Sequence, residues 1–252
     1  MIQKPVASFT ILNEVDSTNN YAMAQVHAGM AKHGDAFFAH SQTSGKGQRG
    51  KSWQTGKGEN IALSIVLVPG MLELSGQFRL SVAVSLACFE FFTKYAGDET
   101  KIKWPNDIYW RDRKAGGILI ENVVGRQGEA KGSWKYAIAG IGININQTGF
   151  EDSIKNPVSL KQITGKDFLP EQLARELHQL VLNRVNELAG KDFDKMMQQY
   201  NNCLYKLNQP VQLKKGNIVF QSIIKSVTET GLLYTTDTID NYFDFGEVEW
   251  IL

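Results

Sequence analysis

The sequence contains little cysteine and no excess of either charge. Two cysteines, Cys88 and Cys203, occur among 252 residues without any C-x-x-C pair, which excludes a disulfide framework and fits a reducing compartment. Lysine and arginine number 27 against 26 acidic residues, a formal net charge of +1. The chain therefore lacks the bulk positive charge of a protein that coats nucleic acid or a membrane, and any anion that it binds must meet a local cluster of cations.

Long apolar runs are also absent. No run approaches the ~20 residues that cross a bilayer, and the first 18 residues hold neither the apolar core nor the cleavage site of a signal peptide. We therefore expect a cytoplasmic protein that does not enter a membrane. Hydrophobic residues make up 42% and charged residues 21%, the composition of a globular protein with one large or two smaller domains.

Hydrophobic periodicity divides the chain into two parts. Apolar stretches predict strands at residues 8–15, 35–41, 60–68, 101–110, 114–124 and 134–146. Helical spacing predicts a helix that starts near Ser17 and others at 75–97, 170–190 and 192–205. From about Asn208 the sequence alternates over short, turn-rich stretches, as in a small antiparallel barrel. These patterns predict a large α/β domain over 1–207 and a small β-barrel over 208–252.

A glycine-rich loop, residues 41–53 with the sequence SQTSGKGQRGKSW, follows the second predicted strand. It contains the G-x-G-x-x-G spacing of a dinucleotide-binding turn, but in that turn a helix must follow at once to receive the pyrophosphate. Here two more glycines and another strand follow, and no helix is expected before Ser75. We therefore reject the dinucleotide interpretation, and no Walker G-K-[ST] spacing occurs elsewhere.

The same loop carries Lys46, Arg49 and Lys51 within six residues. A solvated surface loop would explain these charges. However, the three cations repel one another unless an anion joins them, and the glycines allow the backbone to approach a ligand closely. We expect a loop that is mobile when empty and becomes ordered around a phosphate-bearing ligand.

A second dense passage, KIKWPNDIYWRDRKAGGILIE, covers residues 101–121. Pro105 favours an extended residue before it, and Asn106 and Asp107 then begin a strand close in sequence to Lys103. Lys114 precedes an Ala-Gly-Gly sequence, where backbone can lie against a ligand. An ordinary hairpin lysine and an Asn-Asp turn would explain the same residues, so spacing alone does not assign a function.

Taken together and in this order, DSTNN, SQTSGKGQRGKSW, KWPNDIYW, KAGGILIE and GIGININ resemble the biotin–protein ligases, also called biotin–[acetyl-CoA-carboxylase] ligases. The resemblance covers nearly the whole chain, including the closing GEVEW. It implies an α+β fold, in which a mixed or antiparallel sheet flanked by helices forms a catalytic domain like those of class II aminoacyl-tRNA synthetases and biotinyl/lipoyl ligases. A small Src-homology-3-like barrel follows.

The resemblance also implies a reaction in two steps. Biotin and ATP first give biotinyl-5′-AMP and pyrophosphate, with Mg²⁺ present. The biotinyl group then passes to one lysine of a biotin carboxyl carrier protein, the expected partner. In the first step a carboxylate must meet a triphosphate, and their repulsion has to be offset by cations in a site that contains little water.

The resemblance assigns roles to individual residues. Lys114 matches the lysine at the biotin carboxylate and α-phosphate, and Asp107 matches the aspartate expected to orient or deprotonate the acceptor lysine. Arg49, the third residue expected in catalysis, would close over the intermediate and shield it from water. Biotin contacts are implied for Ser17, Thr18, Asn19, Gln42, Lys46, Gln48, Lys114 and Gly116. ATP or adenylate contacts are implied for Gly45, Gly47, Arg49, Gly50, Trp53, Lys103, Asn106 and Asn144. We expect Trp53 to stack on adenine, and no metal site made of histidines.

The sequence departs from the family in two respects. Family loops commonly read G-R-G-R-R-G, whereas Lys46 and Gln48 stand here for two arginines, so affinity for the intermediate is lower or the burden shifts to Arg49. In addition, DSTNN begins at Asp16, which leaves no room before it for the DNA-binding domain of some members. We therefore expect a monofunctional ligase that does not bind DNA. A homodimer formed by edge pairing of the main sheet stays possible.

Two other functions fit parts of the sequence. A lipoate–protein ligase or octanoyl transferase shares the catalytic fold and faces the same electrostatic problem. A nonenzymatic module that binds nucleotides or nucleic acid would use the basic loop and the barrel. The near-neutral net charge, together with Asp107 and Lys114, counts against this second alternative.

Overall fold

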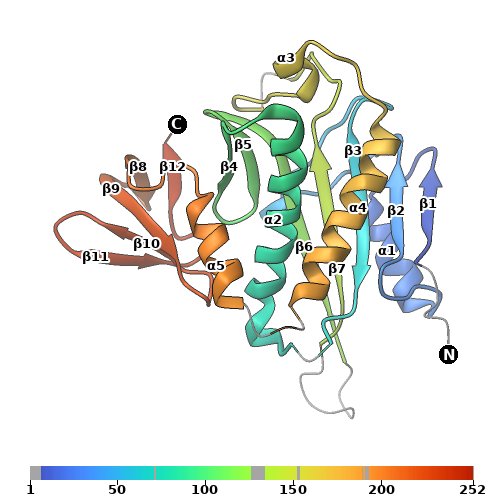
Figure 1. Cartoon of the computed structure of the whole chain (residues 1–252), viewed down its shortest axis with the longest axis horizontal. Coiled ribbons are helices and arrows are strands. Elements are labelled where there is room, and N and C mark those ends of the chain that lie inside the picture. The colour runs from blue at the N-terminus through green and yellow to red at the C-terminus, as the bar shows by residue number, and fades with distance from the viewer. Residues whose placement is uncertain are drawn as a thin grey trace.

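The computed structural model describes residues 7–70, 72–125, 134–151, 154–188, 190 and 193–251. A seven-stranded sheet forms the larger part, in the order β1-β2-β3-β7-β6-β5-β4 (Figure 1). Its strands are β1 (Phe9–Leu12), β2 (Ala36–Ala39), β3 (Ile61–Leu67), β7 (Trp134–Ile143), β6 (Arg113–Val124), β5 (Asp107–Trp110) and β4 (Thr100–Lys103). β1 and β2 run parallel, and the other neighbours run antiparallel. The predicted mixed sheet is confirmed.

Alternating side chains give this sheet two different faces. Odd-numbered residues of β3, from Ile61 to Leu67, belong to the main core with α2 (Gln77–Ala96) and α4 (Pro170–Glu187). The even-numbered Val66 packs with α1 (Thr18–His27) in a smaller core on the opposite face. Because successive strand residues point to opposite faces, one strand serves both cores. Figure 1 shows α2 and α4 side by side on the face turned away from α1.

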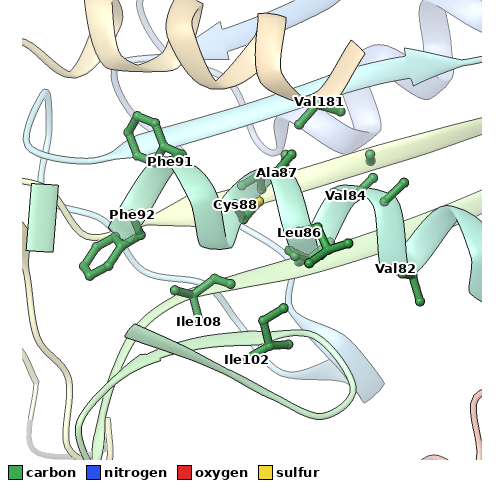
Figure 2. Packing of buried hydrophobic residues seen from close by; sticks show 14 of the residues in the cluster. Val82, Val84, Leu86, Ala87, Cys88, Phe91, Phe92, Ile102, Ile108 and Val181 are labelled. Atoms are coloured by element: carbon green, nitrogen blue, oxygen red, sulfur yellow. The ribbon is translucent and has the colours of Figure 1, made fainter. Parts of the chain in front are cut away.

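Helix α2 supplies the centre of the main core. Leu86, Phe91 and Phe92 are at most 2% exposed, and Figure 2 shows side chains of α2 between Ile102 and Ile108 on one side and Val181 of α4 on the other. Cys88 lies among them, and its burial raises the pKa of the thiol. The helix ends at Gly97, whose φ is 78°, and α4 begins at Pro170, as predicted.

The prediction of one strand over residues 101–110 was wrong. β4 and β5 are separate antiparallel strands, paired from Thr100 with Trp110 to Lys103 with Asp107. The chain reverses between them at Trp104–Pro105, a cis peptide bond. Proline has no N–H to donate to a ladder, so the pairing stops where Pro105 occurs.

Several shorter features differ from the predictions. Two short elements were not predicted. One is α3 (Leu160–Thr164), whose N-terminus Ser159 and Gln162 cap with a capping box, and the other is a 3₁₀ turn at Gln48–Gly50 within the glycine-rich loop. Ser17 precedes α1 as its cap residue, but its side chain makes no capping hydrogen bond. The last predicted helix is α5 (Phe193–Asn202). Residues 189 and 192 of the two predicted C-terminal helices lie outside the described residues.

A second, five-stranded antiparallel sheet ends the chain, in the order β11-β10-β9-β8-β12. Its strands are β8 (Pro210–Lys215), β9 (Ile218–Val227), β10 (Leu233–Thr236), β11 (Asp240–Phe243) and β12 (Glu249–Ile251). It is consistent with the predicted small barrel, while the domain boundary at 207/208 stays a prediction. The indole N–H of Trp104 donates to the Gly231 carbonyl at 3.0 Å, so the reversal between β4 and β5 contacts the turn between β9 and β10. Within the described ranges, we find no helix with the length and apolar character of a membrane span.

Candidate active site

An open cleft of about 1030 Å³ lies between the glycine-rich loop and the face of the main sheet that carries α1. Loop and following residues 42–47 and 49–55 line one side, and Asp16 and Asn20 line the α1 end. Leu119 and Glu121 line the cleft from β6. The loop predicted to hold an anion therefore borders this cleft.

Small residues form the floor beside this cleft. Gly140 of β7 pairs with Ser64 of β3 and with Leu119 of β6. A methyl group on Gly140 would lie 2.3 Å from Asn19 Oδ1, and one on Gly142 would lie 2.3 Å from Trp53 Cε2. Because no real Cβ approaches another heavy atom so closely, these two glycines are what allow Asn19 and Trp53 to lie against the sheet.

Polar residues from three elements meet at the start of α1. The Gln42 side-chain carbonyl accepts from the Thr18 backbone N–H at 2.8 Å and lies 3.2 Å from its hydroxyl. Ser64 Oγ lies 2.7 Å from Thr18 Oγ1 and 2.6 Å from Asn19 Oδ1. Asn19 and Thr18 are 3% and 4% exposed. The structure thus brings together three of the residues predicted to bind biotin, whereas Ser17 makes no capping bond there.

The two strongest catalytic candidates form an ion pair. Lys114 Nζ lies 2.7 Å from Asp107 Oδ1, with the side chains 30% and 19% exposed. The pair lies over Gly117, where a methyl group would be 3.4 Å from Asp107 Oδ1 and 3.6 Å from Lys114 Nζ. Lys114 Nζ is also 6.0 Å from the centroid of the Trp53 ring, which lines the cleft. A cation and a carboxylate are therefore available at the edge of the cleft.

Each polar side chain at the tip of the glycine-rich loop has a protein partner. Lys46 Nζ lies 3.4 Å from Glu121 Oε1, and Gln48 donates to the Ile118 carbonyl at 3.2 Å. Arg49, in a left-handed conformation with φ 56°, donates to the Gly246 carbonyl at 3.0 Å. Arg49 thus contacts the connection between β11 and β12, and its contact with the adenylate stays a prediction. The expected mobility of the loop stays a prediction.

Lys103 lies close to the ion pair of Lys114 and Asp107. It faces Asp107 across β4 and β5, and its Nζ lies 3.4 Å from the Tyr109 hydroxyl and 5.3 Å from the Trp250 ring. Burial lowers the pKa of Lys103 to about 8, although the charge of Asp107 acts in the opposite direction. Asn106 donates to the Ile118 carbonyl at 2.7 Å, the same acceptor that Gln48 uses.

Two residues that are predicted to contact ligands also have structural roles. Asn144 is 4% exposed, and its amide donates to the Val158 carbonyl at 3.1 Å, away from the cleft residues. Gly116 lies so close to β7 that a methyl group would be 2.8 Å from the Gly142 carbonyl. Their contacts with nucleotide and biotin stay predictions.

Sequence reasoning missed Ser64, Glu121 and the two floor glycines. One signal was available for Ser64, because a single hydroxyl interrupts the apolar run IALSIVL of β3. Ser64 is fully buried, and a buried hydroxyl requires a partner. Nothing local indicated that its partners would be Asn19 and Thr18.

The model of the Biotin/lipoate A/B protein ligase family matches residues 12–144, more than half of the chain. The chain belongs to this family. The match runs from β1 to the residue that follows β7, so it contains the glycine-rich loop, the ion pair and the floor glycines.

Individual relatives agree with the family assignment. The bifunctional ligase/repressor BirA of Escherichia coli (strain K12) is 30% identical over 249 residues, which cover 96% of this chain and 73% of BirA. The biotin–[acetyl-CoA-carboxylase] ligase of Paracoccus denitrificans is 27% identical over 88% of this chain and 92% of its own length. The BirA proteins of Salmonella typhimurium and Bacillus subtilis match over 43% and 47% of their lengths.

Solved structures show the same fold. A biotin protein ligase from Aquifex aeolicus in complex with biotin and ATP superimposes with a TM-score of 0.79 over 98% of this chain and 99% of its own, at 24% identity. The biotin protein ligase of Leishmania major in complex with biotinyl-5-AMP gives a TM-score of 0.65 at 22% identity.

Proposed function

We propose that the protein is a biotin–protein ligase, which activates biotin with ATP to biotinyl-5′-AMP and transfers the biotinyl group to one lysine of a biotin carboxyl carrier protein. The observation that carries this proposal is the ion pair of Lys114 and Asp107, which lies beside a cleft bordered by a loop rich in glycine and cations. Relatives that cover most of the chain and carry ligase names support it.

In the first step, a carboxylate oxygen of biotin bonds to the α-phosphorus of ATP, and the bond from that phosphorus to the pyrophosphate oxygen breaks. Both reactants are anions, and their repulsion is large in a partly buried site. Lys114 would offset it by turning from Asp107 toward the reacting oxygens, a movement within reach of a flexible side chain that is 30% exposed. Electrostatic stabilisation of this kind commonly lowers the reaction barrier more than any other single effect in an enzyme.

In the second step, the acceptor amine attacks the acyl carbon, the bond to the phosphate oxygen breaks, and AMP leaves. The amine must lose a proton to act as a nucleophile. Once Lys114 engages the phosphate, Asp107 Oδ1 is free to accept a hydrogen bond from the incoming ammonium and to take its proton. Lys103, which faces Asp107 across the hairpin, keeps a second cation close to the leaving phosphate.

In the first step, Mg²⁺ would bind together with ATP. No group of three metal-ligating side chains is found in the part of the chain that the structure describes. Mg²⁺ in such enzymes is commonly held by substrate phosphates, water and one or two carboxylates, and Asp16 lines the cleft. The ion would supply charge neutralisation at the triphosphate.

The decisive experiment is ATP–pyrophosphate exchange with biotin, lipoate and octanoate as separate substrates, followed by transfer of labelled biotin to a carrier domain. We expect exchange with biotin and none with lipoate or octanoate. Lys114→Met should lower exchange by roughly 10²- to 10³-fold. The matched control is Lys161→Met, which breaks an ion pair of the same 2.7 Å length to the exposed Asp167 and should leave the rate unchanged. Exchange that requires lipoate, or full activity of Lys114→Met, would overturn the proposal.

Three further expectations accompany the proposal. The absence of DNA binding is tested by a gel-shift assay, and sedimentation tests the homodimer. The strands available for edge pairing in the described main sheet are β1 and β4, of which β4 already bridges Leu204 through Ile102. A cytoplasmic location agrees with the reaction proposed, and fluorescence microscopy of a tagged chain tests it.

A further inference from the structure

Glu121 joins two of the residues predicted to bind biotin, although no role was predicted for it. Its Oε2 accepts from the Asn19 side-chain amide at 2.7 Å, and its Oε1 lies 3.4 Å from Lys46 Nζ. The carboxylate is 29% exposed and lines the cleft. It stands two residues after Leu119 on β6, so both residues lie on the face of the sheet that carries α1.

The carboxylate fixes the direction of every hydrogen bond that follows. A carboxylate only accepts, so the nitrogen of the Asn19 amide must face Glu121 and its oxygen must face Ser64. Ser64 has a single hydroxyl proton, and the 2.6 Å contact with Asn19 Oδ1 takes it. Since Ser64 has no second proton for the 2.7 Å contact with Thr18, the Thr18 hydroxyl must donate there and not to Gln42 Oε1, which lies 3.2 Å away.

The consequence reaches Gln42, which lines the cleft, and its hydrogen-bond partner Thr18, which is 4% exposed. With its proton turned to Ser64, the Thr18 hydroxyl offers only lone pairs to a ligand. The Gln42 side-chain oxygen is occupied by the Thr18 backbone N–H at 2.8 Å, so its amide nitrogen is left to donate. The Thr18 hydroxyl and the Gln42 amide nitrogen, which we call the Thr18–Gln42 row, therefore present one acceptor and one donor side by side. A neutral cyclic urea, which has N–H donors and a carbonyl acceptor, is complementary to that pair.

The packing holds the Asn19 side chain in place, and its hydrogen-bond partners set the direction of its amide. It is 3% exposed and lies so close to β7 that a methyl group on Gly140 would be 2.3 Å from its oxygen. Ser64 is fully buried. Reversing the Asn19 amide would place its oxygen against the Glu121 carboxylate, which costs the hydrogen bond between them and sets two acceptors against each other.

We propose that Glu121 and Ser64 are positioning residues, which set the hydrogen-bond direction of the Thr18–Gln42 row so that it accepts a urea-type ring and rejects ligands without one. The inference rests on the proposed function and deepens it, because it explains how biotin is distinguished from acids that have no urea group, such as lipoate and octanoate.

The test is Glu121→Gln, which keeps the size of the side chain but can present either oxygen or nitrogen to Asn19. We expect KM for biotin to rise about tenfold, with kcat and KM for ATP within about twofold of the parent protein. Ser64→Ala should give the same pattern. The double variant should be no worse than the poorer single variant, because both changes break one row.

The matched control is Glu176→Gln. Glu176 is 30% exposed and accepts from Lys94 and Tyr95 at 2.8 and 2.7 Å, outside the cleft, and its variant should leave every constant unchanged. Biotin binding without ATP, measured by calorimetry, gives a second readout. A Glu121→Gln protein with unchanged biotin affinity would overturn the inference. So would a fall in kcat and a rise in KM for ATP that are as large as the rise in KM for biotin. If Glu121→Gln does not fold, Ser64→Ala decides by the same criteria. If the parent protein itself shows no exchange with biotin, the proposed function fails instead.

Discussion

Gly142→Ala is a stringent test of the floor beside the cleft. Gly142 pairs with Ala62 of β3 and Gly117 of β6, so its backbone is held on both sides. A methyl group at this position would lie 2.3, 2.5 and 2.7 Å from Cε2, Nε1 and Cζ2 of Trp53. The indole is rigid and presents three atoms to the new carbon, so either the ring must leave the sheet or β7 must shift.

The size of the effect follows from that overlap. Inserting one carbon into a packed region costs about 1–3 kcal/mol. For a protein of this length, that corresponds to a fall in Tm of roughly 2–12 °C. Alanine has no conformational disadvantage over glycine in a strand, so the loss comes from the overlap alone. If Trp53 stacks on adenine as predicted, the displaced ring also raises KM for ATP.

The assay is thermal and urea unfolding of four proteins: the parent, Gly142→Ala, Trp53→Ala and the double variant. Trp53→Ala removes the overlapping atoms, so the methyl group should cost little in that background, and the coupling between the two changes should exceed about 1 kcal/mol. Gly149→Ala is the control, since a Cβ there meets nothing within 4 Å. If Gly142→Ala is equally destabilising with and without the indole, the reasoning is refuted.

Two further predictions concern charges near the ion pair. The pKa of Lys103 is about 8 in the folded state, against an ordinary value of 10.5, a difference of about 3 kcal/mol. The unfolded chain therefore binds more protons between these values, and the free energy of unfolding should rise from pH 8 to pH 10.5. Lys103→Met should abolish this rise in urea titrations, and an identical slope in both proteins would contradict the assignment. Gln48→Arg adds a cation at the loop tip and should slow release of bound biotinyl-AMP roughly fivefold in a filter assay. Gln54→Arg adds the same charge to the cleft wall and serves as its control. Equal release rates for Gln48→Arg and the parent would exclude ion pairing at position 48.

Local patterns in the sequence predicted the elements that depend on neighbouring residues. The apolar spacing of α2, the glycine at its end and the proline at the start of α4 act within one or two turns. Lys114 and Asp107 are seven residues apart, and hairpin pairing between β5 and β6 brings them to 2.7 Å. Their proximity was therefore within reach of sequence reasoning.

Contacts that depend on strand order were out of reach. Glu121 and Asn19 are 102 residues apart, and Arg49 and Gly246 are 197 residues apart. Periodicity shows which residues of a strand share a face, but it does not show that β7 lies between β3 and β6. Without that order, Ser64 cannot be placed beside Gly140.

The order β3-β7-β6 explains why one face of the sheet can hold a site while the other holds the core. Odd-numbered positions of β7, such as Ala139 and Ile141, are fully or nearly fully buried in the main core. The even-numbered Gly140 and Gly142 have no side chain, so the opposite face is hollow where Asn19 and Trp53 approach it. Burial on the first face fixes the register of β7, since a slip by one residue would expose the core and fill the hollow with side chains. Stability of the core and the shape of the candidate site are therefore set by the same alternation.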